Sequence, residues 1–211
     1  MATQTITRLY DNHANAVEAV QQLEAAGVPH SEISLVSNDA EGRHGAPTST
    51  GTATGLTSGD PDQGAATGAG TGASLGSVLG GGAGLLAGIG ALAIPGIGPI
   101  VAAGWLVAAL TGAGVGAAAG GLVGSLTGAG VSEADAHLHA EGVRRGGTLV
   151  TVRSDETQAA RINTILDGRM PVDLTTRRTE YEADGWKQYD SAAAPYTAEQ
   201  LTTEQKRRAV L

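Results

Sequence analysis

Two closely spaced histidines, His137 and His139, are the residues whose type and spacing suggest a metal-binding site. Residues two positions apart on a helix point to different sides, and neither histidine has a second histidine four positions away. The chain also has no cysteine, which excludes thiolate metal sites, iron–sulfur clusters, disulfides and cysteine nucleophiles. We therefore expect no metal site and no cofactor.

Glycine abundance produces an apparent nucleotide-binding motif at Gly82–Ala87, which has the spacing of a dinucleotide fingerprint. Such a motif must follow a strand and open a helix within a βαβ unit, and this one does not. No Gly-Lys-Ser/Thr sequence exists, and the two lysines, Lys187 and Lys206, both lie in the tail. Serine, histidine and acidic residues form no triad-like group. We expect no catalytic residue and no small-molecule substrate, so the protein is not predicted to be an enzyme.

A pair of arginines, Arg144 and Arg145, precedes a Gly-Gly break at residues 146–147. Positive charge is favourable at the C-terminal end of a helix, which is the simplest role for the pair. The alternative is contact with anionic lipid headgroups.

The tail carries aromatic residues on a polar segment, where such residues often bind a partner. It either folds back over the open face of a sheet or docks onto another subunit. Together with the two arginines, the predicted headgroup or partner contacts are Arg144, Arg145, Trp186, Tyr189 and Tyr196.

Charge divides the chain into regions. Arginine and lysine number 13 against 21 aspartates and glutamates, which gives a net charge of −8 and argues against nucleic-acid binding. The segment from Gln63 to Ser132 contains no charged residue and no histidine. A soluble helix normally has a charged face, which this segment cannot provide.

Glycine recurs every four residues in two ladders within this uncharged segment, separated by a Pro-Gly turn. Such spacing makes a groove on a helix that lets a second backbone approach closely, and its period favours right-handed packing. We therefore predict a glycine-zipper helical hairpin that associates with further copies of itself. The predicted packing residues are Gly72, Gly76, Gly80, Gly84, Gly88, Gly104, Gly112, Gly116, Gly120 and Gly124.

Each arm of this hairpin is long enough to cross a bilayer, since Thr71–Ile94 and Pro99–Leu126 both exceed the roughly 20 residues required. Membrane lipid is therefore an expected partner, and a soluble bundle of hairpins is the alternative. The first residues lack the basic start and apolar run of a signal peptide, and the basic residues lie outside the hairpin. This predicts the cytoplasmic side of the cell membrane, or a soluble cytoplasmic assembly.

The N-terminal elements that precede this segment form a predicted βαβ unit. Thr5–Tyr10 alternates polar and apolar residues as a strand does, and Asp11 or Asn12 caps a helix that ends at Gly27. A second strand follows at Ile33–Ser37.

The C-terminal half repeats this order after a helix that begins at Ser132 or Glu133 and ends near Arg145. We predict a strand at Thr148–Arg153, a helix that Ser154 or Asp155 caps and Gly168 closes, and a last strand at Val172–Arg177. A short tail helix is predicted to begin at Thr197.

Together the halves predict an α+β fold: a split βαβ (ferredoxin-like) domain interrupted by the glycine-zipper hairpin, which would leave from a hairpin tip. The expected divisions are a first half-domain (1–38), a flexible linker (39–71), the helical hairpin (72–130), a second half-domain (131–178) and a tail (179–211).

Several stretches resemble the bacterial general stress protein family of the heat-induced YflT type. They are Leu9–Ala14, Ala19–Val28, Ile33–Ser37 and Glu141–Val152, with a looser likeness at Gly185–Trp186 and Ala194–Thr197. The resemblance implies a stress-induced, non-enzymatic bacterial protein. We expect a structural protein that associates with the membrane and self-assembles; a cytoplasmic ligand-binding or regulatory module is the alternative.

Overall fold

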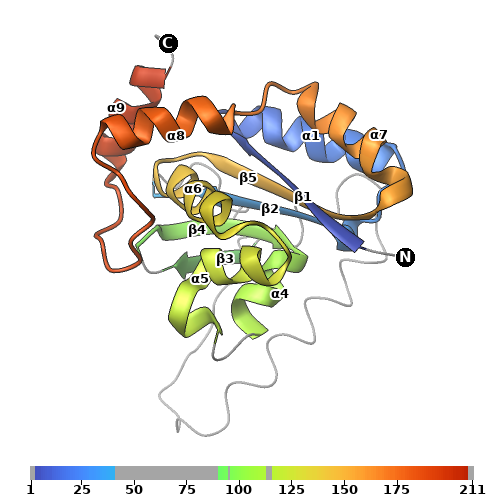
Figure 1. The fold of residues 1–211 in the computed structure, drawn as a ribbon, viewed down its shortest axis with the longest axis horizontal. Coiled ribbons are helices and arrows are strands. Elements are labelled where there is room, and N and C mark those ends of the chain that lie inside the picture. Colours follow the sequence, from blue (N-terminus) through green and yellow to red (C-terminus); the bar gives the residue numbers. More distant parts are fainter. Residues whose placement is uncertain (1–2, 41–89, 95, 113–115, 209–211) are drawn as a thin grey trace, which may run out of the picture.

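The computed structural model describes residues 3–40, 90–94, 96–112 and 116–208, and it has the mixed α+β architecture predicted from the sequence. Five antiparallel strands form one sheet in the order β1-β5-β2-β4-β3 (Figure 1). The strands are β1 (Thr3–Tyr10), β2 (Ile33–Asn38), β3 (Gly90–Ile94), β4 (Gly98–Gly104) and β5 (Thr148–Asp155). The first and second halves of the chain therefore share a sheet, with β5 between β1 and β2.

One face of the sheet is covered by α1 (His13–Ala25) and α7 (Glu156–Asp167) (Figure 1). Both helices begin where the sequence predicts, because the side chains of Asn12 and Asp155 accept hydrogen bonds from the first turn. Leucine, isoleucine, valine and alanine side chains fill the layer between them and the strands. Tyr10 is fully buried there and donates to the Leu166 carbonyl at 2.9 Å.

The opposite face is covered by α6 (Glu133–Arg144), with α4 (Trp105–Gly112) and α5 (Gly116–Gly128) beside it. The helix α6 begins where the sequence predicts, and the Ser132 side chain caps it by accepting from Asp135 N. Glycine at position 142 lets α6 approach the sheet closely, since a methyl group there would collide with the Leu9 side chain. This second core is again almost wholly aliphatic.

The last predicted strand, Val172–Arg177, is wrong. Residues 174–183 form a helix, α8 (Leu174–Ala183), and Asp173 caps it by accepting from Thr176 N at 2.7 Å. The apolar alternation of Val172 and Leu174 comes instead from residues that pack against the α6 core. The fourth strand of a ferredoxin-like sheet is thus a helix in this chain, and β1 is left at the sheet's edge.

The second arm of the predicted hairpin is also wrong as one helix from Pro99 to Leu126. Residues 98–104 form β4, which pairs with β2, and α4 and α5 follow as separate short helices. The β-branched residues Ile100 and Val101 sit in this strand, where they are buried. The first glycine ladder, from Gly72 to Gly88, lies outside the described residues.

The tail turns back onto the domain and ends in α9 (Ala198–Arg208), at the left of Figure 1. Thr197 lies just before it, and its hydroxyl accepts from Gln200 N at 3.3 Å. Between α1 and β2 a single 3₁₀ turn, His30–Glu32, completes the chain's regular elements in the described ranges. No helix within these ranges is both long enough and apolar enough to cross a membrane.

Candidate functional site

The buried side chain of Arg145, in the last turn region of α6, is the centre of the candidate site. Its guanidinium lies 2.7 Å from Glu141, 3.2 Å from Asp184 and 3.3 Å from Glu204. It also stacks 4.1 Å from the centre of the Tyr181 ring. Burial alone would lower the pKa of Arg145, but the hydrogen bond and charge of Glu141 hold it above its usual value. The group therefore stays cationic and acts as a fixed positive charge.

Arg144, its neighbour, binds backbone carbonyls from two distant segments. Its Nε donates to Gly96 O at 3.1 Å, in the turn between β3 and β4, and its Nη2 donates to Ala194 O at 2.9 Å in the tail. The guanidinium also lies 4.9 Å from the centre of the Tyr196 ring. Both arginines that the sequence marked as partner contacts thus bind groups of their own chain, and a headgroup contact by either remains a prediction.

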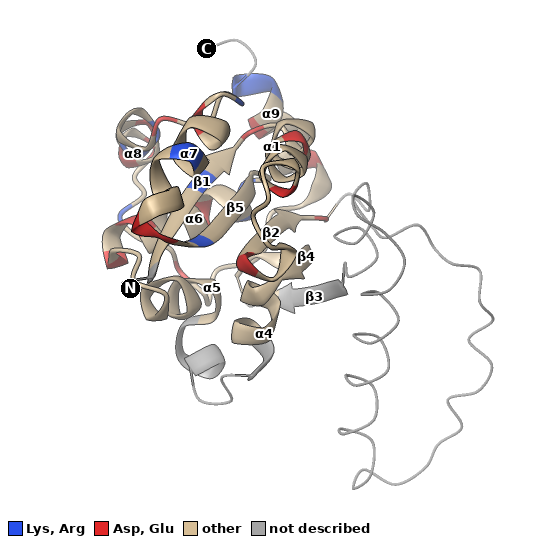
Figure 2. Cartoon of the chain, turned by 90° about the vertical axis from the view of Figure 1, so that its right-hand side faces the viewer, with Lys and Arg blue, Asp and Glu red and all other residues tan. Residues whose placement is uncertain are grey.

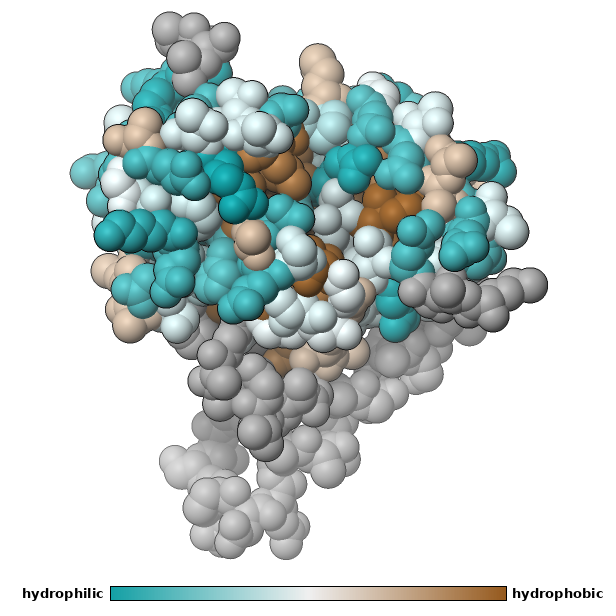
Figure 3. Space-filling model, viewed as in Figure 1, coloured by the Kyte–Doolittle hydropathy of each residue, from teal (hydrophilic) through white to brown (hydrophobic). Residues whose placement is uncertain are grey.

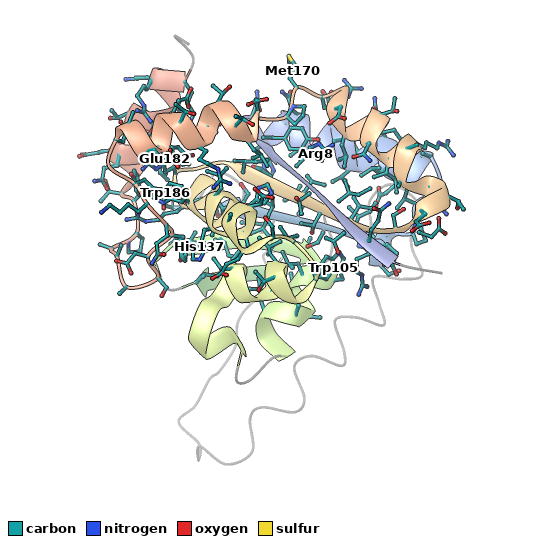
Figure 4. The ribbon with its side chains drawn as sticks, viewed as in Figure 1. Arg8, Trp105, His137, Met170, Glu182 and Trp186 are labelled. Atoms are coloured by element: carbon teal, nitrogen blue, oxygen red, sulfur yellow. The ribbon has the colours of Figure 1, made fainter. Side chains whose placement is uncertain are left out.

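The tail aromatics lie in the same region as these arginines; Trp186 is labelled in Figure 4. Trp186 packs edge-on against Tyr181, with 5.8 Å between ring centres. Tyr189 is buried, and burial raises the pKa of its hydroxyl to about 12. Tyr196 lies beside both arginines. The structure therefore brings all five predicted contact residues to one region, where the tail crosses the end of α6.

A second ion-pair cluster joins the two ends of the chain, and nothing in the local sequence indicated it. The Asp11 carboxylate accepts from Arg177 at 2.9 and 2.7 Å and from Arg208 at 2.9 Å. Burial would raise the pKa of Asp11, but the hydrogen bond from Arg177 and the charge of Arg208 bring it below its usual value. Asp11 stands 166 residues from Arg177, so only the folded chain places them together.

These contacts can hold segments together, but they carry no acid–base chemistry at neutral pH. Every cation named above is an arginine, which does not release its proton in proteins. Their carboxylate partners are engaged in charge-assisted hydrogen bonds. We call this region, comprising Arg144, Arg145, Glu141, Tyr181, Asp184 and Glu204, the tail clamp.

The two candidate histidines have different surroundings on α6. His139 is fully buried against the sheet, with its Nε2 3.0 Å from the Thr7 hydroxyl. Burial lowers its pKa to about 4, helped by the charge of Arg8 and opposed by that of Asp135. His137, labelled in Figure 4, has its Nε2 3.9 Å from Glu133. Among the described residues, no group of three or more potential ligands could hold a metal ion.

The glycines of the second predicted ladder are distributed over three elements. Gly104 ends β4, Gly112 ends α4, and Gly116, Gly120 and Gly124 lie in α5. At Gly104 the φ angle is +90°, and a methyl group would collide with the Ile33 carbonyl oxygen and with Ser34. This glycine is therefore required within the chain itself, where β4 crosses close to β2. Contacts between copies at the other glycines remain a prediction.

Two open cavities accompany these features. One, of about 510 Å³, lies beside the tail clamp and is lined by Tyr196 and α9 residues. The other, of about 390 Å³, lies where the α7–α8 connection meets the edge strand β1, and Thr7, Arg8, Leu9, Val172 and Leu174 are among its lining residues.

No protein-family model matches the chain, and no curated protein and no solved structure matches it either.

Proposed function

We propose that the protein is a non-enzymatic structural protein that self-assembles and associates with membrane lipid through its uncharged, glycine-rich region. The resemblance to general stress proteins makes a bacterial stress response the proposed setting. The cytoplasmic side of the cell membrane is the proposed location.

The separation of charge within the folded domain carries this proposal. The elements β3, β4, α4 and α5 all come from the segment without a charged residue. In Figure 2, β4 and the tan parts of α4 and α5 lie toward one end of the domain and carry no acidic or basic residue, whereas the charged residues lie on the other elements. A domain with one uncharged end can bring that end to lipid or to another copy without desolvating a charge.

Trp105 stands at the border between the two ends (Figure 4). It begins α4, and the guanidinium of Arg153, which also pairs with Glu32 at 3.0 Å, lies 4.7 Å from its ring centre. Tryptophan with an apolar body beside a charged neighbour is typical of the level at which protein passes from lipid to water. This residue supports the orientation of the uncharged end toward the bilayer.

The tail clamp supports a structural role. Its arginines hold the tail against α6 and against the β3–β4 turn, which comes from the uncharged segment. A clamp of this kind fixes the charged and uncharged ends to one another, as a protein that bridges a surface and an assembly requires.

Flotation of the full-length protein with vesicles in a density gradient tests lipid association. We expect the protein to float, to resist a carbonate wash and to be released by detergent. A protein that stays at the bottom of the gradient as a large particle would instead indicate a protein-only assembly.

Self-assembly through glycine is tested by Gly80→Leu, with Gly80→Ala as the matched control. Leucine blocks close approach of two backbones, whereas alanine still permits it. We expect Gly80→Leu to reduce the particle mass measured by light scattering and Gly80→Ala to leave it unchanged. Equal masses for both variants would contradict the glycine-zipper proposal.

A further inference from the structure

Among the residues that the structure describes, the outer edge of β1 is unpaired along most of its length. In an antiparallel pair, the backbone groups of alternate residues point toward the partner strand, and those between point away. The backbone N–H and C=O groups of Leu9 point away from β5, because the Leu9 carbonyl accepts a hydrogen bond from Val172 N at 2.7 Å. Thr7, Thr5 and Thr3 therefore also direct their N–H and C=O groups outward.

Only the end of this edge near Leu9 is covered. Val172 N donates to the outward carbonyl of Leu9, and the Arg8 guanidinium donates to the Thr7 carbonyl at 2.9 Å. Within residues 3–40, 90–94, 96–112 and 116–208, the outward backbone groups of Thr5 have no partner. The 390 Å³ cavity lies at this covered end, and the uncovered part of the edge runs from there toward the start of the strand.

The strand lacks the features that usually prevent another strand from adding to an edge. It pairs with β5 residue for residue from Thr3 to Tyr10, without a bulge, and it contains no proline and no lysine. Natural edge strands commonly carry such features, because an unprotected edge is a template for pairing. Figure 3 shows this face of the molecule with apolar patches set among polar residues.

We propose that β1 pairs antiparallel with β1 of a second copy of this chain, across a two-fold axis at Thr5. The single charged residue of the strand, Arg8, lies toward the covered end and is paired with Asp167 at 2.7 Å. The edge therefore offers no net charge to select a basic or acidic peptide. What it fits is an uncharged, regular, threonine-rich strand, and β1 is such a strand.

The symmetry of the pairing fixes its register. With the axis at Thr5, this residue faces its own copy and Thr7 faces residue 3 of the partner, so that outward backbone groups meet. The Thr7 carbonyl, which already accepts from Arg8, would use its second lone pair for the partner strand. Thr–Thr neighbours across strands stabilise a sheet, which favours Thr5 opposite Thr5. The two-fold contact also closes on itself, so it yields a dimer and not an open fibre. This surface is separate from the glycine-rich segment and does not depend on the proposed function.

Crosslinking tests this register directly, because the chain has no cysteine of its own. Residues that face each other as a hydrogen-bonded pair have Cα atoms about 5.5 Å apart, which a disulfide spans. Full-length Thr5→Cys should therefore form a disulfide-linked dimer under mild oxidation. Gln4→Cys is the control, since Gln4 is more exposed but lies diagonal to its copy, beyond the roughly 7 Å limit.

We expect Thr5→Cys to crosslink at least ten times faster than Gln4→Cys. Random collision would give the opposite order, because the more exposed thiol would react first. A faster reaction at position 4 would overturn the proposal, whatever the particle mass.

A second pair of variants tests the hydrogen bond between the two copies at Thr5 and needs no crosslinking. Thr5→Pro deletes the outward N–H, whereas Thr5→Val keeps it, and both lose the hydroxyl that donates to Ala129 O. In sedimentation experiments we expect Thr5→Pro to halve the mass of the particle and Thr5→Val to preserve it. An unchanged mass in a folded Thr5→Pro variant would refute the pairing. If circular dichroism shows that Thr5→Pro is unfolded, the ratio of crosslinking rates decides.

Discussion

His139 makes the stability of the fold depend on pH. Its side chain is buried, and burial lowers its pKa from about 6.5 to about 4. The folded state therefore disfavours the charged imidazole. Above pH 6.5 the imidazole is neutral in both the folded and the unfolded chain, so the fold has no loss of stability from this residue. As the pH falls from 6.5 to 4, the unfolded chain gains the proton first and the fold loses about 3 kcal/mol.

Replacing His139 by glutamine should remove most of this loss. We expect the free energy of unfolding of the wild type, measured by urea titration, to fall between pH 7 and pH 4.5 more steeply than that of His139→Gln. His137→Gln is the control, because it makes the same substitution on the same helix at a side chain that is partly exposed. Identical slopes for wild type and His139→Gln would show that the buried histidine is not responsible.

Substituting alanine should have opposite effects on stability at Gly104 and at a glycine on an open helix surface. Its φ of +90° and its contact with the Ile33 carbonyl leave no room for a side chain. We expect Gly104→Ala to lower the free energy of unfolding by on the order of 3 kcal/mol, since both backbone strain and a collision contribute.

Gly128 lies in α5, and a methyl group there meets nothing within 4 Å. Gly128→Ala should therefore change stability by less than about 1 kcal/mol, in the stabilising direction. The same chemical denaturation experiment compares the two variants. Equal effects would contradict the role assigned to Gly104.

At the scale of elements, the tail clamp determines whether α8 and α9 stay on the domain. Arg145→Met removes the close partner of the buried Glu141 carboxylate and leaves it only the longer contact with Arg144 at 3.4 Å. Because this second cation remains, we expect the cost to fall below the roughly 3–5 kcal/mol of a fully unpaired buried charge. We expect limited proteolysis to release the tail of Arg145→Met much faster than that of the wild type.

Arg207→Met is the matched control for the clamp. Arg207 pairs with Asp184 and Glu204 as Arg145 does, but its side chain is 40% exposed. A pair at that exposure contributes less than about 1 kcal/mol, so the tail should stay protected. Equal rates of cleavage for the two variants would argue against a clamp centred on Arg145.

The elements that the sequence predicted correctly are those with local start and stop signals. Asn12, Ser132 and Asp155 cap their helices within three residues, so the signal lies in adjacent sequence. The strand predicted at Val172–Arg177 failed because two apolar residues suit either structure. The cap that decides it, Asp173, was not recognised.

Longer-range errors have a different cause. A four-residue glycine period at Gly104–Gly128 predicts a helix from local spacing, whereas residues 98–104 are a strand because β2 offers them an edge. The candidate site shows the same limit. Residue types identified Arg144 and Arg145, but the carboxylate partners of Arg145 at Asp184 and Glu204 could not be found from spacing.

At the scale of the whole molecule, a net charge of −8 predicts which lipids the protein prefers. An acidic domain is repelled by an anionic surface within a Debye length. A contact between uncharged residues and lipid has no charge–charge attraction for salt to screen. We expect flotation with zwitterionic vesicles to be unchanged between 50 and 500 mM salt, and to weaken as anionic lipid is added. Stronger binding to anionic vesicles that salt abolishes would instead indicate headgroup contact by arginines such as Arg144.

The position of β5 has a consequence for how the chain is made. Strands β1 and β2 do not pair with each other in the described sheet, and β5 joins them from between. During synthesis, β2 leaves the ribosome roughly 110 residues before β5, a delay of about 5–20 s at typical rates of translation. Throughout that interval the threonine-rich β1 has no partner strand of the described sheet, whereas β2 can pair with β4 as soon as residues 98–104 have emerged.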